Sequence, residues 1–167
     1  VDYDLTTLLT GSSAVVNTTA NPLVALYSAP ACSTGSTMRV TFQRSGATAS
    51  PFLSDWKACN GVTSMNFYVA GMYPRTTYKM NYEVATGSTV SPGPTILSFT
   101  TGSLPSNLTF PAFTVSVPAG PGTDTAQPIN LHALLSFTNN QSISAATDIS
   151  GHILWYYEFQ DLTDTSI

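Results

Sequence analysis

The chain has 167 residues, of which 43% are hydrophobic and only 8% are charged, with five Lys and Arg against nine Asp and Glu. This length suits one domain of ordinary size, or a small domain with an appendage, and the hydrophobic fraction argues against a disordered chain. The slight acidic excess excludes a basic surface for nucleic acid or an anionic membrane, and no apolar run approaches the roughly 20 residues of a membrane-spanning helix.

Ser and Thr occupy many polar positions, where a typical soluble protein would have about 25% charged residues. This composition is typical of an extracellular β-rich protein whose outward strand faces carry hydroxyl groups. A surface with so little charge is prone to association unless sugars or partners cover it. Asn-x-Ser/Thr sequons provide candidate N-glycosylation sites. They begin at Asn17, Asn107 and Asn140.

Residues 1–20 form an amino-terminal arm with two apolar, β-prone stretches separated by Gly11-Ser-Ser. No sharp turn such as Asn-Gly ties this arm back to the next strand. A strand at a chain end has two fates: it closes the edge of its own sheet, or it adds to an open edge of a neighbouring copy as a donor strand. The sequence leaves both open. The candidate assembly contacts in the arm are Leu5, Leu8, Leu9, Val15 and Val16.

Residues 21–101 contain several short runs in which polar and apolar positions alternate, a period that predicts strands with one buried face. The first predicted strand is Leu23 to Tyr27. Turn-rich sequence, including Ser91-Pro-Gly-Pro, separates these runs, and the segment 45–60 is predicted to be mostly loop, with Trp56 anchored against the core. About seven short strands with such spacing predict an all-β fold, a β-sandwich. The predicted inward-facing residues are Met38, Val40, Phe42, Met65, Phe67, Val69, Tyr78, Met80, Tyr82 and Val84.

The motif Met72-x-Pro74-x-Thr76-x-Tyr78 marks a bend between two of these strands, because Pro74 cannot donate a ladder hydrogen bond. A Tyr just after such a corner can bury its ring while its hydroxyl reaches back to the backbone, as in the tyrosine corner of β-sandwiches. Together with the closing Phe99-Thr-Thr, the motif resembles the fibronectin type III domain, with Met72 where Leu is usual. The resemblance implies that fold and no activity.

The two cysteines, Cys32 and Cys59, both lie in turn-like sequence at strand ends. A disulfide between them would contribute on the order of 3 kcal/mol to stability in the chain-entropy account. Two free thiols are the alternative. A metal site is not expected, since neither a His nor a third Cys is near them in the sequence.

Residues 102–167 form a different unit, predicted to be a linker followed by β-strands and a hairpin. A strand is predicted at 113–117, and the apolar run 129–137 fits either a strand or a short helix. The hairpin turns at Asp148-x-x-Gly151, with Asp and Gly at the positions that a type I turn favours. A unit of this size cannot bury both its faces, so the sandwich, further chain or another subunit must cover it.

Four stretches, taken together, resemble the amino-terminal part of bacterial arylsulfotransferase-like proteins. They begin at Asn21-Pro-Leu-Val, Asn66-Phe-Tyr-Val, Phe99-Thr-Thr-Gly and Thr147-Asp-Ile-Ser. In that family a β-sandwich precedes a β-propeller, and the propeller carries the catalytic histidine. The likeness covers about residues 20 to 157 and stops where the propeller would begin. It therefore implies a shared module and carries over no catalytic residue.

No cluster of residues in the sequence indicates catalysis. His132 and His152 have no partners nearby in the sequence, and structural or exposed roles are expected for both. Glu158, Asp161 and Asp164 are dispersed on a polar tail without the spacing of a calcium loop, whereas Asp148 is explained by its turn. We therefore predict no catalytic, cofactor-binding or metal-binding residue.

Trp155, Tyr156 and Tyr157 place aromatic side chains on both faces of one strand. They fit either a strand that is buried on both sides or a contact surface for other copies of the chain or for glycans. Three functions follow as expectations. The first is a non-catalytic extracellular subunit that self-associates by strand addition into an oligomer or filament. The second is the amino-terminal domain of an arylsulfotransferase-like enzyme, and the third a carbohydrate-binding module.

Overall fold

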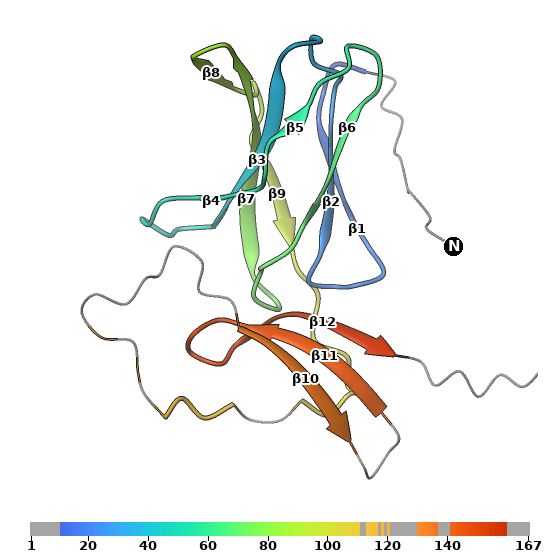
Figure 1. The fold of residues 1–167 in the computed structure, drawn as a ribbon, viewed down its shortest axis with the longest axis vertical. Coiled ribbons are helices and arrows are strands. Elements are labelled where there is room, and N and C mark those ends of the chain that lie inside the picture. The colour runs from blue at the N-terminus through green and yellow to red at the C-terminus, as the bar shows by residue number, and fades with distance from the viewer. Residues whose placement is uncertain are drawn as a thin grey trace, which may run out of the picture.

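The computed structural model describes residues 11–110, 113–116, 118, 120, 130–136 and 141–159, without the side chains of 130–136, 141–142 and 158–159. This part of the chain is all β, as predicted (Figure 1). No helix within it could cross a membrane. The strands are β1 (Val15–Thr18), β2 (Ala25–Ala29), β3 (Thr37–Arg44), β4 (Phe52–Leu53), β5 (Lys57–Ala58), β6 (Met65–Val69), β7 (Thr77–Thr86), β8 (Thr89–Pro92), β9 (Leu97–Thr100), β10 (Asn130–Ser136), β11 (Gln141–Thr147) and β12 (Ile153–Phe159).

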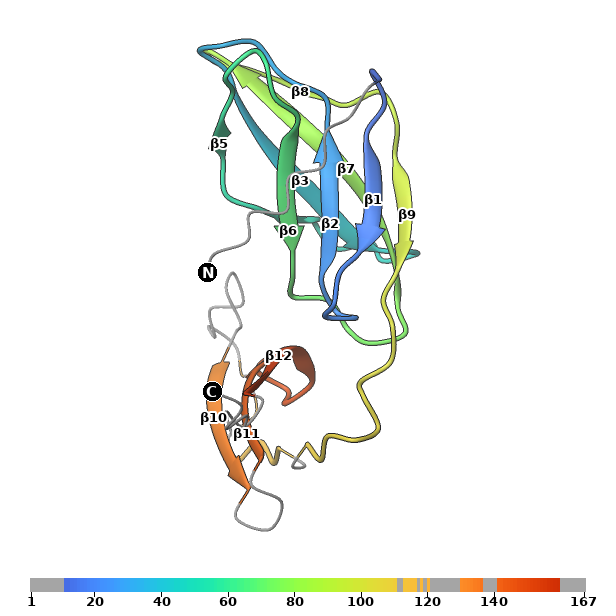
Figure 2. The same ribbon diagram turned by 90° about the vertical axis from the view of Figure 1, so that its right-hand side faces the viewer.

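Strands β1 to β9 form two antiparallel sheets that face each other as a sandwich (Figure 2). One sheet has the order β1-β2-β6. The other has the order β4-β3-β7-β8, with β5 also pairing with β3 and β9 also pairing with β7. Side chains from both sheets meet in one core, because each strand turns alternate residues inward.

The predicted alternation is confirmed in β3, β6 and the first half of β7, whose inward residues are all buried. Farther along β7, Tyr82 and Val84 also pack against the core, as predicted, but they are only half-buried. The reason is length: β7 has ten residues, whereas the strands of the facing sheet have at most five. The second half of β7 therefore extends past the layer that would cover it.

The predicted tyrosine corner is present at the start of β7. Tyr78 is fully buried, and its hydroxyl accepts a hydrogen bond of 2.9 Å from the backbone N–H of Tyr73. Thr101 fixes the same bend, because its hydroxyl donates to the Tyr73 carbonyl at 2.6 Å and accepts from the Thr76 N–H at 2.9 Å. The corner holds the backbone of Tyr73 at the end of the sandwich that meets the carboxyl-terminal strands.

Cys32 and Cys59 form a disulfide at the opposite end of the sandwich, with their Cα atoms 5.3 Å apart. The segment predicted as loop beyond β3 carries the two-residue strands β4 and β5. Trp56 lies between them on the surface, under the guanidinium of Arg39 at 4.4 Å, so the prediction that it anchors the core is wrong. A cation–π contact with Arg39 takes the place of burial.

Strand β1 shows which fate part of the arm takes. It pairs antiparallel with β2 from Val15↔Ser28 to Thr18↔Ala25, so residues 15–18 close the edge of their own sheet. Val15 and Val16 therefore belong to the sandwich, and Val16 packs against its core, while a role for them as assembly contacts stays a prediction. Leu5, Leu8 and Leu9 lie outside the described residues.

Two other local predictions also need correction, one of a turn and one of a strand. The segment around Ser91 was predicted as a turn, but Thr89–Pro92 forms β8, an exposed strand that pairs with the end of β7. Pro92 is tolerated because β8 is at a sheet edge and its missing N–H breaks no ladder. The second correction concerns 113–117, since residues 113–116 form no strand; Phe113 packs instead into a hydrophobic cluster.

The carboxyl-terminal strands form a separate antiparallel sheet of order β10-β11-β12. The run that fitted a strand or a short helix is the strand β10, and β11 and β12 pair around the turn of Asp148, where the Gly151 N–H donates to the Asp148 carbonyl at 3.0 Å. Gly151 has φ +84°, a conformation that favours glycine. In Figure 1, β12 is the strand of this sheet nearest to the sandwich.

Candidate functional site

The candidate site is the junction between the sandwich and the carboxyl-terminal sheet. On the sandwich side it begins with Asn21, in the turn before β2. The Asn21 side chain accepts from the Leu23 N–H at 2.9 Å, which fixes the turn, and its amide donates to the Tyr156 carbonyl at 2.8 Å. That carbonyl belongs to β12, so one side chain of the sandwich covers part of the edge of the second sheet.

Leu23 extends the junction into a small hydrophobic cluster. It is fully buried against Ala145 and Ile153, although the sequence predicted it as the first residue of a sandwich strand. Fully burying one such side chain contributes about 1.5–3 kcal/mol. Four partly buried residues complete the cluster, and the ring of Tyr156 meets that of Phe110 edge-on at 5.4 Å. They are Leu104, Phe110, Phe113 and Tyr156.

The polar part of the junction is centred on the buried carboxylate of Asp148. Its Oδ1 accepts from the backbone N–H groups of Ser150 and His152, each at 2.9 Å, which is how the Asp fixes the β11–β12 turn. Its Oδ2 accepts from the phenol of Tyr73 at 2.7 Å and lies 2.9 Å from Nδ1 of His152. The Tyr73 hydrogen bond spans 75 residues and joins the two sheet systems.

The electrostatics of this cluster keep the Asp148 carboxylate ionised and the Tyr73 phenol protonated, as the hydrogen bond between them requires. Burial by itself would raise the pKa of Asp148, but hydrogen bonds from His152, Tyr73 and Ser150 outweigh it and hold this pKa below its ordinary value. Burial, followed by the hydrogen bond to Asp148, raises the pKa of Tyr73 to about 12. At neutral pH, Asp148 is therefore an ionised acceptor and Tyr73 a protonated donor.

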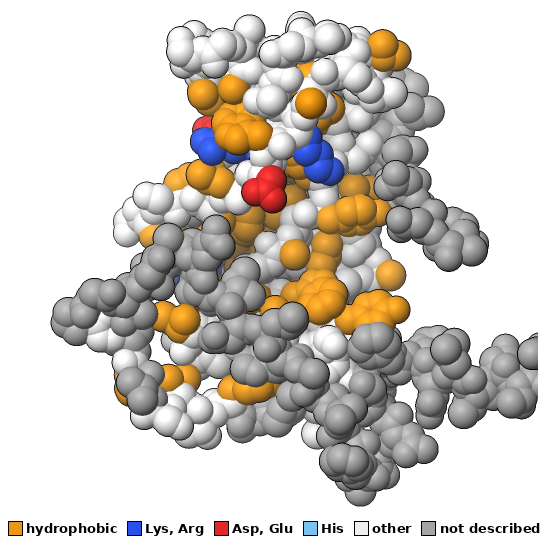
Figure 3. Space-filling view, in the orientation of Figure 1, with side chains coloured by type: hydrophobic (Ala, Val, Ile, Leu, Met, Phe, Trp, Pro, Cys, Tyr) orange, Lys and Arg blue, Asp and Glu red, His pale blue; other side chains and the backbone are white. Residues whose placement is uncertain are grey.

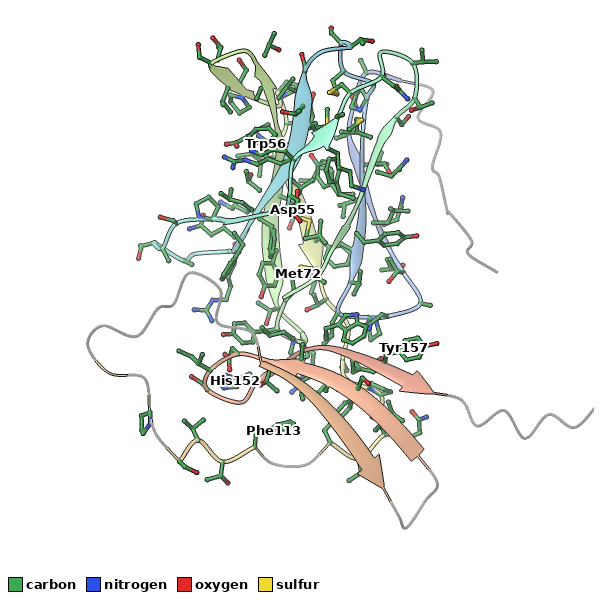
Figure 4. The ribbon with its side chains drawn as sticks, viewed as in Figure 1. Asp55, Trp56, Met72, Phe113, His152 and Tyr157 are labelled. Atoms are coloured by element: carbon green, nitrogen blue, oxygen red, sulfur yellow. A yellow bond between two sulfur atoms is a disulfide. The ribbon has the colours of Figure 1, made fainter. Side chains whose placement is uncertain are left out.

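His152 completes the cluster from the turn, at one end of β12, as Figure 4 shows. Its ring meets that of Tyr73 edge-on with centroids 5.5 Å apart, and 64% of its side chain is exposed. A His whose Nδ1 is held by a carboxylate is also the arrangement of a catalytic general base. Here, however, the Asp148 carboxylate fixes a turn and accepts a hydrogen bond from Tyr73 of the sandwich. The cluster of Tyr73, Asp148 and His152 is therefore suited to be a structural joint between the sandwich and the carboxyl-terminal sheet.

The sequence identified part of this joint. It assigned Asp148 to its turn and gave His152 a structural or exposed role, but it did not identify Tyr73, Asn21 or Leu23. The only sequence signal for Tyr73 was its position beside Pro74 of the corner. That position did not indicate that Asp148 would be its partner. His132 is in β10 and Glu158 in β12, both without described side chains, and Asp161 and Asp164 lie outside the described residues. No three His, Cys, Asp or Glu side chains in the described part gather as metal ligands.

The three aromatic residues of β12 divide between its two faces. Tyr156 turns toward the hydrophobic cluster, whereas Trp155 and Tyr157 stack with centroids 6.4 Å apart and planes at 16°. The alternation of the strand explains this division. A bulge before Trp155 leaves Leu154 as an extra residue, because Ala146 pairs with Trp155 and Thr147 with Ile153, and it brings Ile153 to the cluster face with Tyr156. Tyr157 is 51% exposed, so the face that it shares with Trp155 is in part a surface.

The surface has few charged side chains, which Figure 3 shows for one face of the molecule. Asn17 and Asn107 are exposed, as glycosylation would require, and Asn140 lies outside the described part.

Comparison of this chain with known protein families, curated proteins and solved structures finds no significant match.

Proposed function

We propose that this chain is a non-catalytic, extracellular structural subunit that self-associates by strand addition into an oligomer or filament. The observation that carries this proposal is the difference between the sheet edges. An unpaired strand edge exposes N–H and C=O groups to other chains, and proteins protect such edges with short strands, Pro or charged residues. In this chain the sandwich edges are protected in these ways and one edge of the carboxyl-terminal sheet is not.

Every edge of the sandwich is short or blocked. In one sheet the edge strands β4, β5, β8 and β9 have two to four residues, and β8 ends in Pro92. In the other sheet, β1 has four residues and β6 has five. The ammonium group of Lys57 donates to the Asn66 carbonyl of β6 at 2.8 Å, which occupies an acceptor that an added strand would use.

Strand β10 lacks these protections. It has seven residues, Asn-Leu-His-Ala-Leu-Leu-Ser, with no Pro and no Lys, Arg, Asp or Glu. It pairs with β11 on one side, and no strand of the described part pairs with the other. The equally long β12 is covered in part by Asn21. A long, uncharged edge of this kind is suited to accept a strand from another chain.

The sandwich itself supports a structural role of the fibronectin type III kind, which we include in the proposal. Two features support this part of the proposal: three strands face a sheet centred on β3 and β7, and a tyrosine corner lies at the start of β7. The disulfide favours an oxidising compartment, consistent with an extracellular location. The exposed face of Trp155 and Tyr157 adds a contact area for other copies or for glycans.

Two proline variants of β10 test the proposal. Neighbouring residues of a strand direct their N–H groups to opposite sides, so one of Ala133→Pro and Leu134→Pro removes a donor to β11 and the other removes a donor of the free edge. We expect the variant that loses a donor of the free edge to remain folded, as measured by circular dichroism. The same variant should lose assembly in sedimentation velocity and in negative-stain images. Assembly at the unmodified level in both variants would contradict strand addition at β10, and a wild-type chain that stays monomeric at all concentrations would contradict self-association itself.

The alternative function is the amino-terminal domain of an arylsulfotransferase-like enzyme. The observation that favours it is the antiparallel β10-β11-β12 sheet with its Asp148 turn, which has the form of a propeller blade lacking one strand. In that case the free edge of β10 would be completed by further chain of the same protein. The full reading frame separates the two proposals, because a propeller requires several more hairpins of this type.

A further inference from the structure

We propose that the strand accepted by β10 is the amino-terminal segment 4–10 of a second copy, so that copies join head to tail. This inference rests on the proposed function and names both partners of its contact. The acceptor is the outer edge of β10, and the donor is the stretch Asp-Leu-Thr-Thr-Leu-Leu-Thr.

The register of the carboxyl-terminal sheet shows what an added strand would extend. Leu131 pairs with Ala146, which pairs with Trp155, and Ala133 pairs with Ser144, which pairs with Tyr157. These residues share one face, with small residues on the middle strand between apolar residues on the outer two. An apolar strand beside β10 would therefore continue an apolar face that already carries the half-exposed Tyr157.

The amino-terminal segment has the matching pattern. In an extended conformation Leu5 and Leu9 would share one face with Thr7, while Asp4 would be on the other face with Leu8. The six residues from Leu5 to Thr10 carry no charge, so nothing in them opposes pairing with the uncharged β10. Ten residues precede the described part, and the seven of β10 require a donor of about seven residues, or roughly 23 Å at 3.3 Å per residue.

The position of β1 makes the contact head to tail. Its first residue, Val15, pairs with Ser28, and β2 continues from there toward Cys32 and the disulfide. The other end of β1 leads to Asn21 and the junction. Figures 1 and 2 show β1 beginning at the end of the sandwich that is farther from β10. Donor and acceptor are thus different surfaces, and a heterologous contact of this kind forms a ring if its rotation closes and a filament if it does not.

Cross-linking between two single-cysteine populations tests the pairing. Both native cysteines are in the disulfide, so one introduced cysteine gives each protein a single reactive thiol. Full-length Thr7→Cys protein is mixed with full-length Ala133→Cys protein, disassembled and reassembled together, and treated with a short bis-maleimide. The matched control replaces Ala133→Cys with Val90→Cys, on the edge strand β8, where Val90 is 49% exposed.

We expect a mixed dimer from Thr7→Cys with Ala133→Cys and its loss with Val90→Cys. A variant carrying Leu5→Asp and Leu9→Asp should lose both the dimer and assembly while keeping its circular dichroism spectrum. Dimers from Ala133→Cys alone would show β10 pairing with β10, which overturns the donor but not strand addition. A cross-link confined to one monomer of a Thr7→Cys/Ala133→Cys double variant would overturn the head-to-tail contact. Assembly without any of these cross-links would overturn this inference and leave self-association in place.

Discussion

The two three-stranded sheets of this chain, β1-β2-β6 and β10-β11-β12, have the same antiparallel arrangement in different surroundings. The first faces a second sheet, and its inward residues, such as Tyr27 and Phe67, are almost completely buried. The second has Leu23 and the linker against one face, while the other carries the half-exposed Tyr157. The comparison shows that pairing of strands does not by itself bury a sheet; a facing layer does.

The two sheets also differ in how they are held. The sandwich has a large core and a disulfide, whereas the carboxyl-terminal sheet is attached through a small cluster and the hydrogen bonds of Asn21 and Asp148. Stability is therefore uneven along the chain, and the second sheet should separate from the sandwich at a lower free energy than the sandwich unfolds.

The substitution Phe67→Ala should have the largest effect, because it removes a buried aromatic side chain from the sandwich core. Such substitutions cost about 3–5 kcal/mol, so we expect a large loss in the free energy of unfolding of the whole sandwich, measured by denaturant titration. The control is Tyr68→Ala at the next position, where the side chain is 52% exposed and a change within about 0.5 kcal/mol is expected. Similar losses in both variants would contradict the assigned orientation of β6.

Removal of the disulfide in a Cys32→Ser/Cys59→Ser variant should follow, with a loss of about 3 kcal/mol. The loss should appear in unfolding of the sandwich, because both cysteines are at the end away from the carboxyl-terminal sheet. Hydrogen exchange of the β11 and β12 amides under native conditions should remain as in the wild type. Selective deprotection of these strands would show that the disulfide stabilises the second sheet as well.

Much of the sandwich could be predicted because its determinants are local. Alternation located β3, β6 and β7, and Pro74 with Tyr78 located the corner. The joint could not be predicted, because Tyr73 and Asp148 are 75 residues apart and neither has a distinctive neighbouring pattern. Leu23 was assigned to the sandwich for the same reason: an apolar residue beside a strand shows that it is buried but not which layer buries it.

Tyr73→Phe should have a smaller and local effect. It removes one hydrogen bond to a buried carboxylate, a loss of about 1–3 kcal/mol that should appear in attachment of the carboxyl-terminal sheet. We expect faster hydrogen exchange in β11 and β12 with little change in β3. Tyr27→Phe is the matched control, because its hydroxyl is buried in the sandwich core and makes no hydrogen bond within the described residues. It should leave hydrogen exchange in β11 and β12 unchanged; if both variants deprotect these strands, Tyr73 is not a specific joint.

Acid should weaken the attachment through Asp148. The folded-state pKa of Asp148 lies below its ordinary value of about 3.9, so the ionised carboxylate stabilises the joint above that pH. This contribution is lost as the pH falls below about 4 and through the lower folded-state pKa. We expect β11 and β12 to deprotect in that window before the sandwich unfolds, with most of this dependence missing in Asp148→Asn. An unchanged acid profile in that variant would assign the effect to another group.

The smallest effect under ordinary conditions should be the corresponding loss in alkali. The pKa of Tyr73 is raised to about 12, so its protonated phenol contributes stability that is complete below the ordinary Tyr value of about 10 and is lost as the pH rises toward 12. Burial also raises the pKa of Tyr27 and Tyr78, but these lie in the sandwich core, so their ionisation opposes folding of the sandwich. Tyr73→Phe should therefore remove the alkaline step in β11 and β12 exchange and keep the global alkaline transition. If the step persists in Tyr73→Phe, the core tyrosines control the attachment, and the two sheets unfold as one unit.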